Sequence, residues 1–340
     1  MINSVLRHSL ARLLNREDLT REDAAALLEA MLQDDATDAQ IAATLIALAA
    51  KGETVAELAG MASVLRARAV RVSSCHTAFI DTAGTGSSRA KTFNVSTAAA
   101  FVIAGAGLAV AKHGNRAASS KSGSADVLTA LGVNVNALAK VSENCLNELG
   151  ICFMFAPLYH GATARVAGIR RELGVHTTFN LLGPLSNPAG APRQIIGVWR
   201  EDLVALLANV LAALGTERAW VVHGEDGLDE ITLAGKTLVA EAHEGSVKTF
   251  AIAPADFGLA VGTLDHLRGG DAEANARIIR DVLTGERRDE ARALVVVNSA
   301  AALLVGGKAA TLDDAARQAE ESIDTGEALK KLEQLVKATN

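Results

Sequence analysis

The first seventy residues place apolar side chains at helical spacing. Ile41, Leu45 and Leu48, for example, fall on one face of a helix, and polar or small residues fill the positions between them. Three Thr-x-x-(Asp/Gln/Glu) patterns resemble capping boxes, in which two side chains satisfy the unpaired amides at a helix start. They lie at Thr20-Asp23, Thr37-Gln40 and Thr54-Glu57. We therefore expect three helix starts in a small helical bundle that ends near residues 70–77.

After residue 73 the pattern changes to short apolar strands that alternate with helical stretches. The expected strands are TAFID (77–81), LAVAKHG (108–114), ICFMFA (151–156), RQIIGVW (193–199) and RAWVVHG (218–224), followed by a hairpin over 237–254 and three C-terminal helices. Such alternation is typical of right-handed βαβ crossovers and a mostly parallel sheet, whose ligand site lies at the carboxyl ends of the strands. The expected fold class is α/β, with a small N-terminal helical domain before a larger α/β domain.

The composition excludes several classes of protein. Hydrophobic residues make up 49% of the 340 residues, which is ample for a core. The net charge of −6 and the scattered basic residues argue against nucleic-acid binding, because such proteins usually carry a basic stripe. The longest apolar run, 98–111, is shorter than the roughly 18 residues that span a bilayer, so no membrane partner is expected.

Cysteine usage and the N-terminus indicate a cytoplasmic location. The cysteines are Cys75, Cys145 and Cys152. They show no CxxC spacing, so we expect reduced thiols rather than a disulfide scaffold or a zinc site. Arg7, Arg12 and Arg16 interrupt the first residues, which leaves no apolar segment of a secretion signal.

A glycine-broken loop, DTAGTGSSRAKTFNVST over 81–97, lies between a predicted strand and a predicted helix. The Walker A spacing fails, because Thr85 and Ala90 stand where that motif needs glycine. The dinucleotide-binding fingerprint begins correctly but has Arg89 in place of its third glycine. Two interpretations remain, a phosphate cradle at a helix start or an ordinary turn before a capped helix.

A second loop, KHGNRAASSKSGSAD over 112–126, again joins a strand to a helix start. Its basic side chains are Lys112, His113, Arg116 and Lys121. One basic loop alone is often solvated surface. Two such loops after successive parallel strands face the same crevice, however, and this favours a polyphosphate or phosphoribosyl ligand.

Two further segments carry charges with a chemical use. Asp229 and Glu230 follow a strand in HGEDGLDEIT, and hard oxygen ligands near a phosphate suit Mg²⁺, with a plain acidic turn as the alternative. Arg170 lies on a predicted helix before a predicted turn at Gly183-Pro184. A guanidinium that faces a cleft would bind a substrate carboxylate, whereas an ordinary surface charge would not.

Together these blocks resemble a known family. The chain carries GTG…TFNVSTAAAF, AKHGNRAASSKSGSADVLTALG, RRELGVHTTFNLLGPLSNPAG and HGEDGLDEIT, in that order. This series is similar to that of the anthranilate phosphoribosyltransferases, and the resemblance runs along nearly the whole chain. It implies a nucleoside phosphorylase-like fold in which a helical domain, residues 1–72, is completed by helices from about 160–190 and hinged to the α/β domain, residues 73–340. It also implies a homodimer.

The resemblance further implies the residues that bind substrates and metal. Phosphoribosyl pyrophosphate would contact Gly84, Ser87, Ser88, Thr92, Asn94, Val95, Ser96, Thr97, Lys112, His113, Gly114, Asn115, Arg116, Ala117, Ala118, Ser119, Ser120 and Ser124. Anthranilate would contact Gly84, Asn115 and Arg170, with His113, His160 and Pro184 along its tunnel. Two Mg²⁺ ions would be held by Ser96, Asp229 and Glu230.

The implied reaction moves a phosphoribosyl group from diphosphate to the amine of anthranilate, a step of tryptophan biosynthesis. Catalysis would be mainly electrostatic, because Lys112, helix-start amides and Mg²⁺ stabilise the leaving diphosphate. No side chain is assigned as catalytic. His113 and His160 are candidate proton acceptors, and packing or hydrogen bonding is the alternative role for each.

The chain departs from the family pattern at two places. Residues 87–89 read Ser-Ser-Arg where GTGGDG would supply two glycines and an acid, which changes the charge beside the expected metal site. Gly161, Thr163 and His176 alter the wall on the anthranilate side. Two alternatives therefore stay open, a transferase of the same fold that uses another aromatic amine and a non-catalytic paralogue that binds phosphorylated ligands.

Overall fold

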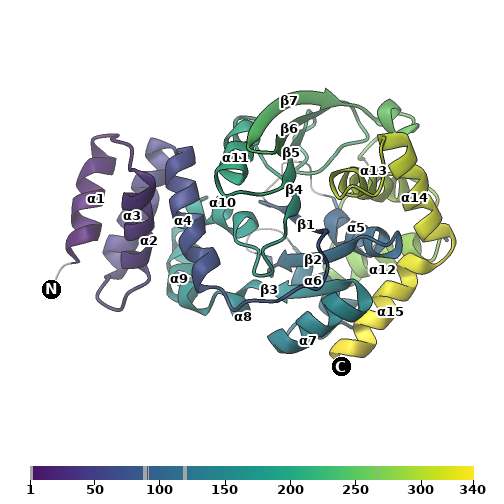
Figure 1. Cartoon of the computed structure of the whole chain (residues 1–340), viewed down its shortest axis with the longest axis horizontal. Coiled ribbons are helices and arrows are strands. Elements are labelled where there is room, and N and C mark those ends of the chain that lie inside the picture. Colours follow the sequence, from purple (N-terminus) through teal and green to yellow (C-terminus); the bar gives the residue numbers. More distant parts are fainter. Residues whose placement is uncertain (1–2, 87–89, 91, 118–120, 266) are drawn as a thin grey trace.

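Among the described residues, one sheet of seven strands forms the centre of the larger part of the molecule (Figure 1). The strands are β1 Phe79–Gly84, β2 Ala109–Gly114, β3 Ile151–Phe155, β4 Arg193–Gly197, β5 Arg218–Gly224, β6 Thr237–His243 and β7 Ser246–Ile252. Their order is β3-β2-β1-β4-β5-β6-β7. The first five pair in parallel, and β6 and β7 add an antiparallel hairpin at one edge, which confirms the expected mostly parallel sheet. This computed structural model describes residues 3–86, 90, 92–117, 121–265 and 267–340.

The two faces of the sheet belong to two hydrophobic clusters. Successive residues of a strand point to opposite faces, so Ile195 packs in one cluster and its neighbour Ile196 packs in the other. The helices of the first cluster are α5 Val95–Gly105, α6 Ser124–Ala130, α12 Ala272–Leu283, α13 Glu290–Val305, α14 Leu312–Asp324 and α15 Glu327–Thr339. Between β2 and β3 lie α6, α7 (Ala139–Asn144) and a π-helical turn, Cys145–Leu149. The second cluster joins α11 (Asp202–Ala213) to the N-terminal helices.

The predicted number of C-terminal helices is wrong, because the described residues contain four, α12 to α15. The break that is easiest to miss is at Thr325-Gly326, where only two residues separate α14 from α15. Gly326 has a φ of +79°, a left-handed conformation that turns the chain within one residue. No helix among the described residues is long and apolar enough to cross a membrane.

The described residues of the helical domain form four helices, and this domain lies at one end of the molecule (Figure 1). They are α1 Ser4–Leu14, α2 Arg21–Met31, α3 Asp38–Lys51 and α4 Val55–Arg68. Each of the last three begins after a threonine predicted to cap it. At Thr37 and Thr54 both halves of the capping box are formed, and the side chain of Thr20 accepts a hydrogen bond from the amide of Asp23. The three predicted helix starts are therefore confirmed.

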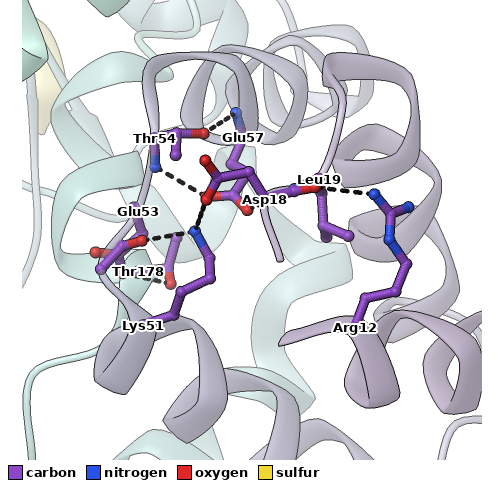
Figure 2. Close-up of polar contacts among 9 residues, drawn as sticks. Arg12, Asp18, Leu19, Lys51, Glu53, Thr54, Glu57 and Thr178 are labelled. Carbon is purple, nitrogen blue, oxygen red and sulfur yellow. Dashed lines mark hydrogen bonds and ion pairs between the residues drawn. The ribbon is translucent and has the colours of Figure 1, made fainter. Parts of the chain in front are cut away.

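A buried ion pair fixes the start of α4 (Figure 2). Glu57 is fully buried, and its carboxylate accepts hydrogen bonds from the amides of Leu19 at 2.9 Å and Thr54 at 2.8 Å. Lys51 places its ammonium 3.1 Å from Glu57 and 2.7 Å from Asp18. The buried charge is stable because an ammonium and two amides replace its water. These contacts tie together the α1–α2 loop, the end of α3 and the start of α4.

The chain between β3 and β4 leaves the sheet and joins the helical domain. It contains α8 Ala156–Tyr159, a 3₁₀ turn at Gly161–Thr163, α9 Ala164–Leu173 and α10 Thr178–Leu185. The helix α9 packs against α3, and α10 packs against α3 and α4. At the first residue of α10, the hydroxyl of Thr178 donates to Glu53 at 2.7 Å (Figure 2).

The turn predicted at Gly183-Pro184 is wrong, because both residues lie within the last turn of α10. Proline is costly inside a helix because it lacks an amide donor and its ring crowds the preceding turn. Here it stands near the end of a short helix, where the lost intrahelical bond affects little of the helix.

Candidate active site

Three of the predicted site segments meet near the carboxyl ends of β1 and β2. Lys112, near the end of β2, lies with its Nζ 2.5 Å from the carbonyl oxygen of Thr82 on β1. The same Nζ is 3.3 Å from the hydroxyl of Ser96 in the first turn of α5. The amide of Ser96 donates to Glu230 Oε1 at 3.2 Å. The basic loop, the helix start and the acidic pair, which are far apart in the sequence, therefore contact one another.

Burial changes the pKa values of the charged groups at this contact. Burial of Glu230, together with the neighbouring charge of Asp229, raises the pKa of Glu230 to about 8, and Lys112 and the Ser96 amide oppose this shift. Burial lowers the pKa of Lys112, and the charges of Asp81 and Glu230 oppose that shift. The carboxyl groups of Asp81 and Glu230 thus favour the charged form of the buried Lys112. A bound cation would relieve the repulsion between Asp229 and Glu230.

The donor atoms at this point fit Mg²⁺. Asp229, Glu230 and the Ser96 hydroxyl offer hard oxygen ligands, which Mg²⁺ prefers. Within the described ranges, no group of three His, Cys, Asp or Glu side chains is arranged to hold a metal ion. Mg²⁺ usually takes one or two carboxylates and completes its shell with substrate phosphates and water. The site therefore fits an ion that shares its ligands with a diphosphate.

Two glycines allow the acidic segment to approach the sheet. Gly84 and Gly197 are partners at the ends of β1 and β4. A Cβ on Gly197 would lie 1.7 Å from the carbonyl oxygen of Asp229, and a Cβ on Gly84 would lie 3.3 Å from its Oδ2. Any side chain at position 197 would push the acidic segment away from the sheet. The backbone geometry therefore requires glycine there.

Asp126 organises the second loop. Its carboxylate accepts hydrogen bonds from the amides of Ala117 at 3.0 Å and Gly123 at 2.9 Å, and it pairs with Arg116 at 3.0 Å. The hydroxyl of Ser124 donates to the carbonyl of Asn115 at 3.3 Å. These bonds fold the described ends of the loop, 114–117 and 121–126, against the start of α6.

The remaining candidates for the phosphoribosyl side are distributed around this centre. Asn94 links the two loops, since its Nδ2 donates to the carbonyl of Ser122 at 3.4 Å. Thr92 forms an isolated bridge with Arg268, and Val95 and Thr97 are buried in the first turn of α5. The predicted contacts Ser87, Ser88, Ala118, Ser119 and Ser120, and the altered Arg89, lie outside the described residues.

Two buried histidines lie side by side at the end of β2. The rings of His113 and His160 have their centroids 5.1 Å apart, and their Nε2 atoms have no hydrogen-bond partner in the described part of the chain. Burial lowers the pKa of His113 to about 3, helped by the charge of His160 and opposed by the carbonyl of Gly183. Burial also lowers the pKa of His160. Both rings are therefore neutral near pH 7.

Arg170 lies on α9 with its guanidinium directed to the start of α10. It donates to the hydroxyl of Thr177 and to Asn180 Oδ1, each at 3.1 Å, and its guanidinium carbon is 5.5 Å from the ring centroid of Phe179. These bonds use two of the five donors of a guanidinium, which leaves donors for a carboxylate. The described hydrogen bonds of Arg170 are therefore made to the start of α10.

Helix α10 connects the arginine to the histidines. Its N-terminal end contacts Arg170, and near its C-terminal end the carbonyl of Gly183 faces His113. The carbonyl of Pro184 accepts a hydrogen bond from the buried Gln194 of β4 at 3.0 Å. One short helix thus spans the distance between two groups that are expected to contact or line the path of anthranilate.

The altered residue His176 forms part of a separate hollow. Its ring lies 4.6 Å, centroid to centroid, from Trp199 just after β4. Both line a cavity of about 650 Å³ that also includes Arg200, His223 and Asp226. The cavity opens beside the carboxyl ends of β4 and β5, and the Lys112–Ser96–Glu230 contact does not line it.

Three buried polar residues that support the site had no signal of their own in the sequence. Asp81 accepts hydrogen bonds from the amide of His113 at 3.1 Å and from Asn187 Nδ2 at 2.7 Å. Asn275 on α12 donates to Asn94 Oδ1 at 2.9 Å. Asp81 stood inside the quoted glycine loop and Asn187 inside the quoted NLLGPLSNPAG block, so position near a motif was the available clue. Asn275 had none.

Comparison with known proteins shows similarity along nearly the whole chain. Residues 76–329 match the family described as glycosyl transferase family, a/b domain, and residues 7–69 match glycosyl transferase family, helical bundle domain. An anthranilate phosphoribosyltransferase of Anaeromyxobacter dehalogenans (strain 2CP-C) is 53% identical over 98% of this chain and 99% of its own length. The enzyme of that name from Moorella thermoacetica is 48% identical over 98% of both chains.

Solved structures agree with the fold. The crystal structure of anthranilate phosphoribosyltransferase from Thermus thermophilus superposes with a TM-score of 0.92 and 39% identity, covering 97% of this chain and 99% of that one. The Saccharomyces cerevisiae enzyme in complex with PRPP and Mg gives a TM-score of 0.89 at 28% identity, over 98% and 97% of the two chains.

Proposed function

Since the chain belongs to the anthranilate phosphoribosyltransferase family, we propose that the contact of Lys112, Ser96 and Glu230 marks the place where its reaction occurs. The protein transfers the phosphoribosyl group of 5-phosphoribosyl 1-pyrophosphate to anthranilate, which gives N-(5-phosphoribosyl)anthranilate and pyrophosphate in tryptophan biosynthesis. The single observation that supports this placement is that three sequence-distant segments, each suited to a diphosphate or its metal, meet within hydrogen-bond distance.

On the donor side, we propose that the loops after β1 and β2 bind phosphoribosyl pyrophosphate. The proposed contacts that the structure describes are Gly84, Thr92, Asn94 to Thr97, Lys112 to Ala117 and Ser124. The amides at the start of α5 carry partial positive charge, and Lys112 adds a full one. Asp229, Glu230 and Ser96 would hold Mg²⁺, which when bound stabilises the negative charge that develops on diphosphate.

On the other side, we propose that Arg170 binds the carboxylate of anthranilate, with Gly84 and Asn115 as further contacts. The bonds of Arg170 to Thr177 and Asn180 fix the guanidinium plane before substrate arrives. His113, His160 and Pro184 would line the path to the sugar. A Saccharomyces cerevisiae relative has been solved with 4-fluoroanthranilate, which supports an aromatic amine site in this fold.

The proposed mechanism needs no strong base. The neutral amine nitrogen forms a bond to C1 of the ribose while the C1–O bond to diphosphate breaks, and diphosphate leaves with the electron pair. The amine then loses one proton. Lys112 and the α5 amides stabilise the departing oxygens, and closure of the helical domain over the sheet would exclude water that competes with the amine. Of the two neutral imidazoles, we keep His160 as the candidate that accepts the proton late, because the pKa of about 3 makes His113 a weak base.

We also propose the organisation of the working enzyme. The helical domain would comprise residues 1–72 completed by helices from 160–190, and residues 73–340 would form the α/β domain. A cytoplasmic homodimer with two Mg²⁺ ions per protomer is the proposed form. The exposed apolar side chains Val5 and Leu14 on α1 and Ile46 on α3 favour the helical domain as the dimer contact.

An activity assay tests the proposed function. Purified protein with phosphoribosyl pyrophosphate and Mg²⁺ should consume anthranilate, measured as loss of its fluorescence, and release one diphosphate per anthranilate. Consumption of another aromatic amine in place of anthranilate would assign the reaction to a same-fold relative. Binding of diphosphate by calorimetry without turnover of any amine would instead identify a non-catalytic paralogue.

A further inference from the structure

A buried asparagine lies in the middle of α13, a helix of the α/β domain whose residues are mostly buried. Asn298 on α13 is 4% exposed, and the residues on either side of it in the helix are mostly buried alanines, valines and leucines. A polar side chain in such a place is costly unless each of its donors and acceptors is paired. Asn298 makes three hydrogen bonds, so the reason for its presence is given by its partners.

Two of the three bonds are made to the backbone of one residue. Asn298 Oδ1 accepts from the amide of Ile231 at 2.9 Å, and its Nδ2 donates to the carbonyl of Ile231 at 3.0 Å. The third bond runs from Nδ2 to the carbonyl of Leu294, one turn earlier in α13, at 2.9 Å. The amide group is therefore fixed to its own helix and pairs with Ile231 as a neighbouring strand would.

Ile231 directly follows the acidic pair. Residues 228–231 lie outside the strands and helices, so no regular ladder holds this stretch of backbone. The carboxylate of Glu230 accepts a hydrogen bond from the amide of Ser96. The amide of the next residue, Ile231, donates a hydrogen bond to Asn298. On the other side, the carbonyl of Asp229 lies against Gly197. Asn298 thus supplies one of the contacts that set where the acidic pair stands relative to α5.

We propose that Asn298 is a positioning residue for the metal-binding acidic pair. Its side chain holds the 229–231 backbone so that the carboxylates of Asp229 and Glu230 and the Ser96 hydroxyl converge on one cation. The inference rests on the proposed role of Asp229 and Glu230 in binding Mg²⁺. Partners that orient metal ligands typically change metal affinity by about 10- to 100-fold when they are removed, although they do not touch the ion.

The test compares three variants by their affinity for Mn²⁺, used as a paramagnetic probe. Free Mn²⁺ is measured by electron paramagnetic resonance during titration of the full-length protein with saturating inorganic pyrophosphate, after correction for Mn²⁺ bound to pyrophosphate alone. Asn298→Ala should weaken Mn²⁺ binding by about 10- to 100-fold. Ser299→Ala is the matched control, because Ser299 is its neighbour in α13, is fully buried, and has a hydroxyl without a partner among the described residues.

Glu230→Gln separates the inference from the function on which it rests. If Glu230→Gln leaves Mn²⁺ binding unchanged, the metal role of the acidic pair is wrong, and the inference is wrong with it. If Glu230→Gln weakens binding but Asn298→Ala does not, only the role of Asn298 is overturned. If Asn298→Ala does not fold, Asn298→Ser takes its place, because serine leaves a smaller cavity.

A second readout distinguishes positioning from general stability. Asn298→Ala should raise the Mg²⁺ concentration for half-maximal activity by about the same 10- to 100-fold factor, while KM for anthranilate at saturating Mg²⁺ changes little. A merely structural role predicts the opposite, a lower melting temperature with an unchanged Mn²⁺ affinity and an unchanged Mg²⁺ requirement.

Discussion

The proposed chemistry of the site depends on buried charges. Lys112 is 4% exposed and Asp81 is fully buried, and burial raises the pKa of Asp81 to about 6. Both side chains make hydrogen bonds to neighbouring strands and loops, so the proposed binding of a diphosphate should need little reorganisation. Such preorganised charge is worth more inside a protein than in water, because the surroundings screen it less.

Replacement of Arg170 tests the proposed recognition of anthranilate. A charged bidentate pair contributes about 1.5 to 3 kcal/mol, so Arg170→Ala should lower kcat/KM for anthranilate by roughly 10- to 150-fold. KM for phosphoribosyl pyrophosphate should change much less, because Arg170 is not among the residues proposed to bind that substrate. Initial rates measured with each substrate varied in turn check this.

The neighbouring arginine provides the control. Arg171 follows Arg170 in α9 and is exposed, so Arg171→Ala removes the same charge from the same helix without touching the site. It should leave kcat/KM for anthranilate and KM for phosphoribosyl pyrophosphate close to those of the unaltered protein. If Arg170→Ala weakened the binding of both substrates equally, the arginine would stabilise the fold rather than bind anthranilate.

His113 should make stability depend on pH. Burial, together with the charge of His160, lowers the pKa of His113 to about 3 from its ordinary value of 6.5. Below pH 6.5, His113 therefore becomes protonated in the unfolded chain while it stays neutral in the folded protein. The stability that is present above pH 6.5 is lost as the pH falls. The raised pKa of Asp81 acts in the opposite direction between pH 3.8 and about 6.

His113→Gln isolates the contribution of this one ring. Between pH 6.5 and 5 the free energy of unfolding should fall less steeply in His113→Gln than in the unaltered protein, by at most about 1.4 kcal/mol per pH unit. Urea titrations at several pH values measure the two slopes. His8→Gln, at an exposed position of α1, should keep the original slope. Parallel curves for His113→Gln and the unaltered protein would contradict a neutral buried imidazole.

Local signals explain which elements could be predicted from the sequence. A capping box is complete within four residues, so Thr37 and Thr54 predicted the starts of α3 and α4 correctly. Alternation of strand and helix is also local, and it predicted the parallel strands. The turn at Gly183-Pro184 was predicted wrongly, because residue type favours a turn while packing on α3 and α4 keeps the helix.

Long-range contacts explain what the sequence could not supply. The meeting of Lys112 with Ser96 and Glu230 was expected from the topology, since carboxyl ends of parallel strands share one edge. The partners Asn275 and Asn298 lie on C-terminal helices, and nothing near them in sequence shows that they bond to Asn94 and Ile231. Only the folded chain places a lone asparagine against a backbone from another segment.

The buried ion pair at the start of α4 should dominate the stability of the helical domain. Glu57→Ala removes a carboxylate and leaves the ammonium of Lys51, whose side chain is 4% exposed, with the exposed Asp18 and the carbonyl of Gly52. Breaking a buried pair in this way typically costs about 3 to 5 kcal/mol, whereas loss of the cap in Thr54→Ala should cost about 1 kcal/mol. Urea unfolding followed by circular dichroism compares the two variants.

An exposed glutamate calibrates this comparison. Glu22 lies in the first turn of α2 and is exposed, so Glu22→Ala should change the free energy of unfolding by no more than about 0.5 kcal/mol. If Glu57→Ala is no worse than Thr54→Ala, the pair contributes through its cap alone and its buried charge is of no consequence.

The arrangement of the two cores couples the helical domain to the sheet. The cluster that contains Leu27 and Leu58 of the N-terminal helices also contains Leu182 of α10, Leu207 of α11 and Val221 of β5. Among the described residues, the four N-terminal helices and α10, α11 and β5 therefore share one continuous hydrophobic core. A movement of the helical domain would therefore carry α10 with it, and with α10 the groups that contact Arg170 and His113.

The shared core predicts that the four N-terminal helices do not fold alone. In a fragment of residues 1–72, the side chains that pack on α10 and α11 would face water, and a unit of this size has little other core to compensate. We expect a fragment with partial helix content by circular dichroism but no cooperative thermal transition, and with amide hydrogens that exchange within minutes. The full chain measured alongside should protect the same amides strongly. A cooperative transition in the fragment, with protected amides in α2 and α4, would show that the helical domain is an independent unit and that its contact with α10 and α11 is secondary.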